Sequence, residues 1–104
     1  LYMNLAYQKQ CANLYIYMSG ELDEYNASLV RDKVDALIDA NISVEKVIVN
    51  LAGVRFMDST GIGFLIGRYK KLKRCSTPMY IQEPNLNADK ILNISGIYSL
   101  IPKM

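Results

Sequence analysis

The chain has 104 residues, of which 51% are hydrophobic and 21% charged, and its formal net charge is +2. This length suits one domain with a single core, and the composition excludes a disordered chain or a coiled coil. A charge so close to balance argues against direct nucleic-acid binding, which needs a strongly basic face. No apolar run approaches 18 residues, and the first ten residues lack a secretory pattern, so we expect a cytoplasmic protein without a membrane span.

The sequence contains no histidine. This excludes a Ser-His-Asp triad, a Cys-His dyad and the zinc sites built on histidine. Cys11 and Cys75 stand far apart without metal-ligand spacing, which suggests a reducing compartment and inert thiols. We therefore expect no catalytic residue, no metal site and no bound cofactor.

Alternating apolar and polar residues predict two strands at the start of the chain. One run covers Leu1 to Tyr7 and the other covers 13–19. The short break at 9–12 predicts a hairpin, although it lacks the glycine that such turns favour. The apolar spacing then changes to three and four residues over 25–40, which predicts an amphipathic helix with Asp23 as its N-cap.

The alternation of strand and helix continues to the end of the chain. Short apolar runs predict strands at 47–51, 79–82 and 97–101. Amphipathic spacing predicts one helix at 60–74 and a shorter one that begins at Pro84-Asn85 and ends at Gly96. Together these elements predict an α/β fold in one domain, residues 1–104, with a mixed, mainly parallel sheet of four to five strands and about three helices.

Two local details of the second half are also predicted. Gly53 is expected to open a loop that leads to Phe56-Met57. The basic residues of 68–74 are expected to form a solvated helix end that complements the helix dipole. An electrostatic contact with an acidic partner is the alternative for this cluster.

Polar residues gather where the second helix begins, in the segment 56–63, Phe-Met-Asp-Ser-Thr-Gly-Ile-Gly. One interpretation is purely local: Asp, Ser and Thr cap helices, and glycines let a helix start lie close to a sheet. A phosphate cradle is a weaker interpretation, because Ile66 stands where the G-x-G-x-x-G pattern needs its third glycine.

Ser59 could act in two ways. As a nucleophile it would need a base, and the sequence offers no histidine and places neither Lys70 nor Lys71 near it. As a phosphorylation site it is well suited, since a helix N-terminus tolerates the added negative charge. Thr60 lies nearer the first helical turn, where we expect it to be tied to the backbone as a cap.

The segment Gly20-Glu21-Leu22-Asp23 and the later segment 56–63, in this order, resemble the anti-sigma factor antagonists of the STAS domain family. The resemblance extends over essentially the whole chain through 47–51, 67–70 and 94–97, and it is nearest to the antagonists that act in sporulation.

This resemblance implies a partner-switching module without catalysis. Ser59 would be phosphorylated by an anti-sigma factor that is an ATP-dependent serine kinase, and a serine phosphatase would reset it. The resemblance implies a monomer or weak dimer that does not bind a membrane, with a partner-binding surface formed by Asp23, Asp58, Ser59, Thr60, Gly61 and Gly63. The alternative is a nucleotide-binding or scaffold STAS domain of another signalling assembly.

Two departures from the sporulation pattern leave the pathway open. Glu24-Tyr25 stand where sporulation antagonists often carry two histidines, and Thr60 replaces a second serine, as in antagonists of the general stress response.

Overall fold

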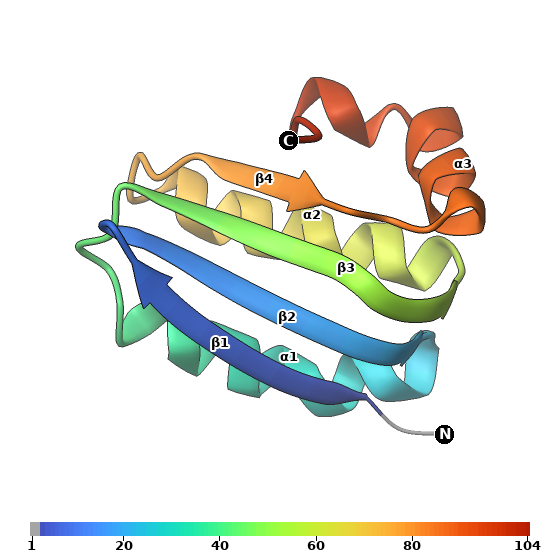
Figure 1. Ribbon diagram of the computed structural model, residues 1–104, viewed down its shortest axis with the longest axis horizontal. Coiled ribbons are helices and arrows are strands. Elements are labelled where there is room, and N and C mark those ends of the chain that lie inside the picture. Colours follow the sequence, from blue (N-terminus) through green and yellow to red (C-terminus); the bar gives the residue numbers. More distant parts are fainter. Residues whose placement is uncertain (1–2) are drawn as a thin grey trace.

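In the computed structural model, which describes residues 3–104, four strands form one mixed sheet in the order β1-β2-β3-β4 (Figure 1). Strand β1 (Asn4–Gln10) pairs antiparallel with β2 (Asn13–Leu22). Strands β2, β3 (Lys46–Met57) and β4 (Met79–Gln82) are parallel. The predicted α/β class and the mainly parallel sheet are confirmed. Leu1, part of the first predicted strand, lies outside the described residues.

The predicted hairpin is confirmed, but its turn is shorter than the predicted break. Gln10 pairs with Asn13, so only Cys11 and Ala12 form the turn. Both have positive φ angles, 52° and 67°, as a two-residue turn with the twist of its strands requires. The pairing of β1 with β2 on either side of the turn imposes positive φ angles, which neither cysteine nor alanine favours.

Helices α1 (Glu24–Asp39) and α2 (Ser59–Lys73) lie side by side on one face of the sheet (Figure 1). Both begin within one residue of the prediction. Their apolar stripes pack onto the inward-facing residues of the strands, and the buried residues at this contact include Val30, Val34, Ile38, Leu65, Leu72, Leu14, Ile16, Val47, Val49 and Ile81. No helix within residues 3–104 is long and apolar enough to cross a membrane.

The loop predicted at Gly53 does not form, because β3 continues to Met57. Gly53 instead lets β3 pass close to β2: a Cβ atom there would lie 2.6 Å from the Cβ atom of Ser19. The register between the two strands shifts at this point. Gly53 therefore does not open a loop. It permits two strands to approach closely, which is a known reason for a glycine inside a strand.

The prediction of a last strand at 97–101 is also wrong. Helix α3 (Leu86–Ser95) ends at Gly96, which has a φ of +79°, and the short 3₁₀ helix η1 (Ile97–Ser99) follows. Ile97 and Ile101 are both buried, and their spacing of four residues suits a helical turn better than a strand. Lys103, beyond the predicted strand, makes an isolated parallel bridge with Ile81 of β4.

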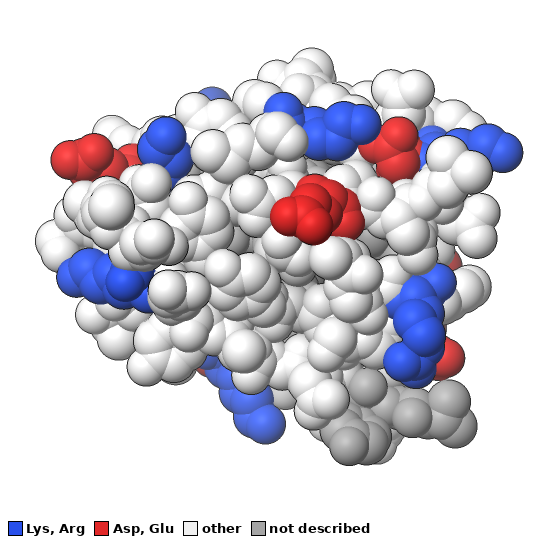
Figure 2. Space-filling model, viewed as in Figure 1, with Lys and Arg blue, Asp and Glu red and all other residues white. Residues whose placement is uncertain are grey.

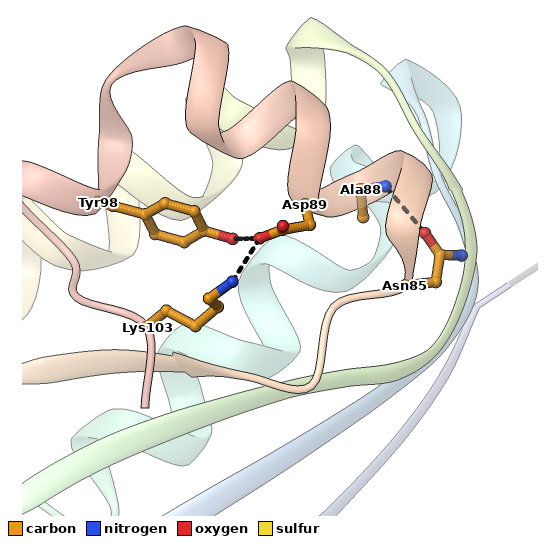
Figure 3. Close-up of polar contacts among 5 residues, drawn as sticks. All are labelled: Asn85, Ala88, Asp89, Tyr98 and Lys103. Atoms are coloured by element: carbon orange, nitrogen blue, oxygen red, sulfur yellow. Dashed lines mark hydrogen bonds and ion pairs between the residues drawn. The ribbon is translucent and has the colours of Figure 1, made fainter.

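A polar cluster around Asp89 holds the C-terminal residues against α3 (Figure 3). The Tyr98 hydroxyl and the Lys103 ammonium both donate to Oδ1 of Asp89, at 2.5 Å and 2.9 Å. At the start of α3, Asn85 accepts from the Ala88 N–H at 2.8 Å and caps the helix, which begins where the sequence predicts. The cluster joins helix α3 and the chain end into one unit.

Candidate functional site

Asp23 caps α1, as its position in the sequence predicts. Its Oδ1 atom accepts a hydrogen bond from the Asn26 N–H at 2.9 Å, and its backbone is extended. One of the free N–H groups at the helix start is thereby satisfied. Because asparagine caps a helix about as well as aspartate, this structural role does not need the negative charge.

Asp58 caps α2 in the same way, with Oδ1 accepting from the Thr60 N–H at 2.9 Å. The prediction that Thr60 acts as a cap is wrong, because Thr60 supplies the N–H that is capped. Ser59 is the first residue of the helix and is exposed, whereas Thr60 is half-buried. Since Asp58 occupies the cap position, the Ser59 hydroxyl is not needed there.

The two caps lie at the same edge of the sheet because the residues before them are paired. Leu22 at the end of β2 is in register with Met57 at the end of β3, and the strands are parallel. Neighbouring strands are about 4.8 Å apart, so Asp23 and Asp58 leave the sheet next to each other. The carboxyl end of a parallel sheet is the edge at which α/β proteins commonly place their binding sites.

The two glycines of the segment serve different purposes. Gly61 is buried, and a Cβ atom there would lie 2.5 Å from Cγ of Met57 and 3.2 Å from Cδ2 of Leu22. It allows α2 to start close to the strand ends, as the local interpretation predicts. Gly63 is exposed, and nothing lies within 4 Å of the place of its missing Cβ. The fold does not require a glycine at position 63.

A groove of about 370 Å³ runs between the two helices, here called the α1–α2 groove. Thr60 and Gly63 are among its walls, and so is Arg68 of the basic cluster 68–74. The sequence does not single out the other wall residues for a site: Glu24, Ala27, Ser28, Arg31 and Phe64. Two of the predicted partner-binding residues, Thr60 and Gly63, therefore border this groove.

Arg68 corrects part of the predicted solvated helix end. It is buried, with Nε 2.8 Å from Oδ1 of Asp35 on α1, an ion pair without the alignment of a good hydrogen bond. Its guanidinium also lies over the Phe64 ring, 4.8 Å from the centroid. Burial lowers the pKa of Arg68, and the charge of Asp35 offsets part of this effect.

Lys71, one turn further along α2, has its Nζ 2.9 Å from Oδ1 of Asp39. Only Lys70, Lys73 and Arg74 match the exposed cluster that the sequence predicts. The spacing along α2 does indicate that Arg68 is buried, because Arg68 falls in the buried stripe of the helix, between Leu65 and Leu72.

The chemistry available at this edge is limited. Ser59 offers an exposed hydroxyl, but Lys70 stands eleven residues along α2, about 16 Å away along the helix axis. Neither Lys70 nor Lys71, which lies further along α2, can therefore serve as its base. Within residues 3–104, no three His, Cys, Asp or Glu side chains are grouped so that they could hold a metal ion.

Comparison with known proteins assigns the chain to a family. The family described as "STAS domain" matches residues 2–104. The chain is 32% identical over 89 residues to the anti-sigma F factor antagonist of Paenibacillus polymyxa, covering 86% of this chain and 75% of the relative. It is 25% identical to the anti-sigma-B factor antagonist of Bacillus subtilis (strain 168), covering 86% and 79%.

Solved structures agree on the fold. The unphosphorylated anti-sigma factor antagonist SpoIIAA superposes with a TM-score of 0.79 at 24% identity, over 97% of this chain and 88% of that one. An anti-sigma factor antagonist from Mycobacterium paratuberculosis gives a TM-score of 0.85 at 18% identity, over 97% and 84%. The chain therefore belongs to the STAS domain family, with the anti-sigma factor antagonists among its relatives.

Proposed function

We propose that this STAS domain is an anti-sigma factor antagonist that is switched by phosphorylation of Ser59. Its unphosphorylated form binds a kinase-type anti-sigma factor in the cytoplasm, and the sigma factor is released. Phosphorylation of Ser59 by that partner, with ATP, ends the binding, and a serine phosphatase restores it. The domain itself performs no catalysis in this cycle.

The position of Ser59 carries the proposal. Its hydroxyl is exposed at the start of α2, while the neighbouring Asp58 takes over the capping role. A kinase can therefore reach Ser59 without removing a hydrogen bond that holds the helix. Asp23, which emerges beside it, supplies a second carboxylate within the same surface.

Electrostatics explain why phosphorylation would alter binding and leave the fold intact. A phosphate adds a charge of about −1.5 to −2, which the positive end of the α2 dipole stabilises. The Asp58 carboxylate repels it and favours an outward direction. The new charge would stand among the proposed partner-binding residues Asp23, Asp58, Ser59, Thr60, Gly61 and Gly63, where an unmatched charge weakens association.

The direct test is phosphorylation in vitro with a candidate anti-sigma factor and ATP, followed by mass spectrometry of the modified peptide. Wild type and Thr60→Ala should each gain one phosphate, whereas Ser59→Ala should gain none. Phosphate on Thr60 would contradict the assignment of the site. Binding or turnover of nucleotide by the domain alone would support the alternative, a nucleotide-binding STAS domain.

A further inference from the structure

An exposed apolar patch lies between the end of β3 and helix α3. Phe56 of β3 is 50% exposed and Ile94 of α3 is 85% exposed, and Ile91 of the same helix is half-buried. The three side chains border a hollow of about 390 Å³, here called the α3 hollow. Its other walls are Met57, Asn87 and the two basic residues Arg55 and Lys90. Apolar surface with a polar rim is typical of an interaction site.

The fold holds the two sides of the α3 hollow in place. The Asn85 side chain, which caps α3, donates from Nδ2 to the Val54 carbonyl oxygen on β3 at 2.9 Å. On its inner side, α3 buries Ala88 and Leu92 in the core. Ile94 comes two residues after Leu92 in the helix and therefore points away from the core. Because both sides of the hollow are fixed, a partner can bind without reorganising it.

The charges in the walls of the α3 hollow have one sign. Arg55 and Lys90 are both exposed. Asp89 belongs to the polar cluster that holds the chain end, and Glu21, in register with Phe56 on β2, lies outside the walls. Figure 2, in the same view as Figure 1, shows mainly uncharged side chains over α3, with lysine or arginine atoms at the edge of the molecule. The hollow therefore suits an apolar group with negative charge next to it.

Ser59 lies close enough to the α3 hollow for one partner to cover both. Phe56 precedes Ser59 by three residues, and consecutive Cα atoms are about 3.8 Å apart, so the Cα atoms of these two residues are at most about 11 Å apart. A standard interface covers about 800 Å² on each protein, which is a disc of about 16 Å radius. An interface of this size centred on Ser59 includes Phe56.

The proposed partner-binding residues do not supply the apolar part of such an interface. Apart from the buried Gly61, they offer carboxylates, hydroxyls and Gly63, whereas the centre of a protein interface is usually its most apolar part. Phe56 and the isoleucines of α3 provide exposed apolar surface beside them.

We propose that the α3 hollow anchors the anti-sigma factor through an apolar side chain of that partner, with acidic residues next to it that pair with Arg55 and Lys90. This inference rests on the proposed function, because it names how the same partner is held. The hollow lies beside the Ser59 hydroxyl and not at it, so the contact stabilises the complex equally before and during phosphoryl transfer. It therefore contributes to affinity and leaves the chemical step unchanged.

Binding and phosphorylation are measured with a purified anti-sigma factor that phosphorylates wild-type Ser59. Ile94→Ser should raise both the Kd and the KM at least fivefold with an unchanged kcat. Ile42→Ser is the matched control, because Ile42 is 54% exposed beyond the other end of α1, and it should behave like wild type. Lys90→Glu should weaken binding at least tenfold at low salt and less at high salt, whereas Lys9→Glu on β1 should not.

A photo-crosslinking amino acid in place of Ile94 identifies the contact directly. Mass spectrometry should find it joined to a peptide of the anti-sigma factor that carries Asp or Glu next to an apolar residue. The same amino acid in place of Ile42 should give no crosslink. A crosslinked peptide without acidic residues would contradict the proposed pairing with Arg55 and Lys90.

The outcomes separate this inference from the proposed function. If Ser59 is phosphorylated and Ile94→Ser binds like wild type, the α3 hollow is not the anchor, and the proposed function stands. A larger loss in Tyr25→Ser than in Ile94→Ser would place the anchor on α1. Binding of wild type, but not of Lys90→Glu, to phosphatidylglycerol vesicles would assign the hollow to a membrane. A wild type that neither binds nor is phosphorylated would overturn the proposed function and this inference with it.

Discussion

Arg68 of α2 and Asp35 of α1 form an ion pair, 2.8 Å between Nε and Oδ1, that joins the two helices beside the α1–α2 groove. The arginine is buried, whereas the carboxylate is partly exposed, so Asp35 balances a charge that has little access to water. This ion pair links the later halves of the two helices, away from their capped starts.

Removing Asp35 should therefore destabilise the domain. Asp35→Ala leaves the Arg68 guanidinium buried without a counter-charge, and we expect a loss of about 2 kcal/mol in the free energy of unfolding. Urea unfolding measures it. The exposed Asp32, 3.7 Å from Arg31, is the matched control, and Asp32→Ala should change stability by less than about 0.5 kcal/mol. Equal losses in both variants would contradict a buried ion pair.

Substitutions of Asp23 can separate its capping role from its proposed role in partner binding. Asp23→Asn keeps the cap and removes the charge, so the melting temperature should hardly change while binding to the anti-sigma factor weakens. Asp23→Ala should in addition lower stability by about 1 kcal/mol. Thermal unfolding and calorimetric titration measure the two effects. Unchanged binding by Asp23→Asn would reduce Asp23 to a structural residue.

The three glycines of α2 should respond differently to alanine. Gly63→Ala and Gly67→Ala meet open space and should stabilise the domain by up to about 1 kcal/mol each. Gly61→Ala places a Cβ against Met57 and should destabilise it by about 1–3 kcal/mol. If the partner contacts the start of α2, Gly63→Ala weakens binding more than Gly67→Ala. Equal effects on binding would argue against a contact at Gly63.

Charge at Ser59 should control binding. Ser59→Ala should bind the anti-sigma factor like wild type, and Ser59→Asp should bind at least tenfold more weakly with an unchanged circular dichroism spectrum. Thr60→Asp places the same charge one residue further into the helix, and its binding is compared with that of Ser59→Asp. Tight binding by Ser59→Asp would show that charge at this residue is not the switch.

The cluster around Asp89 makes stability depend on pH. Hydrogen bonds from Tyr98 and then Lys103 lower the pKa of Asp89, and burial, together with the hydrogen bond to Asp89, raises the pKa of Tyr98. Because the folded-state pKa of Asp89 is depressed, its contribution is complete above the ordinary aspartate pKa of about 3.9 and is lost as pH falls through the folded value.

Asp89→Asn should thus lower the melting temperature at pH 7, and the difference from wild type should shrink as the pH falls below about 4. Differential scanning calorimetry at a series of pH values measures this convergence. Asp32→Asn, an exposed aspartate on α1, should show no such trend. A constant difference across all pH values would assign the effect of Asp89 to packing.

The features predicted well from the sequence are those that depend on neighbouring residues. Helix starts follow from the caps Asp23, Asp58 and Asn85, because capping is local chemistry. The errors concern contacts between distant segments. The local sequence predicts a loop at Gly53 because the contact that requires this glycine is with Ser19 of another strand. It predicts a solvated Arg68 because the counter-charge, Asp35, belongs to another helix.

The pairing of Leu22 with Met57 has a wider consequence for how such a surface can diversify. Backbone hydrogen bonds of the parallel ladder, which are independent of side-chain identity, determine how far apart Asp23 and Asp58 emerge. Substitutions on the outer faces of α1 and α2 can therefore change which protein is recognised without moving the two carboxylates. Partner specificity and the placement of these charges are separable properties of this domain.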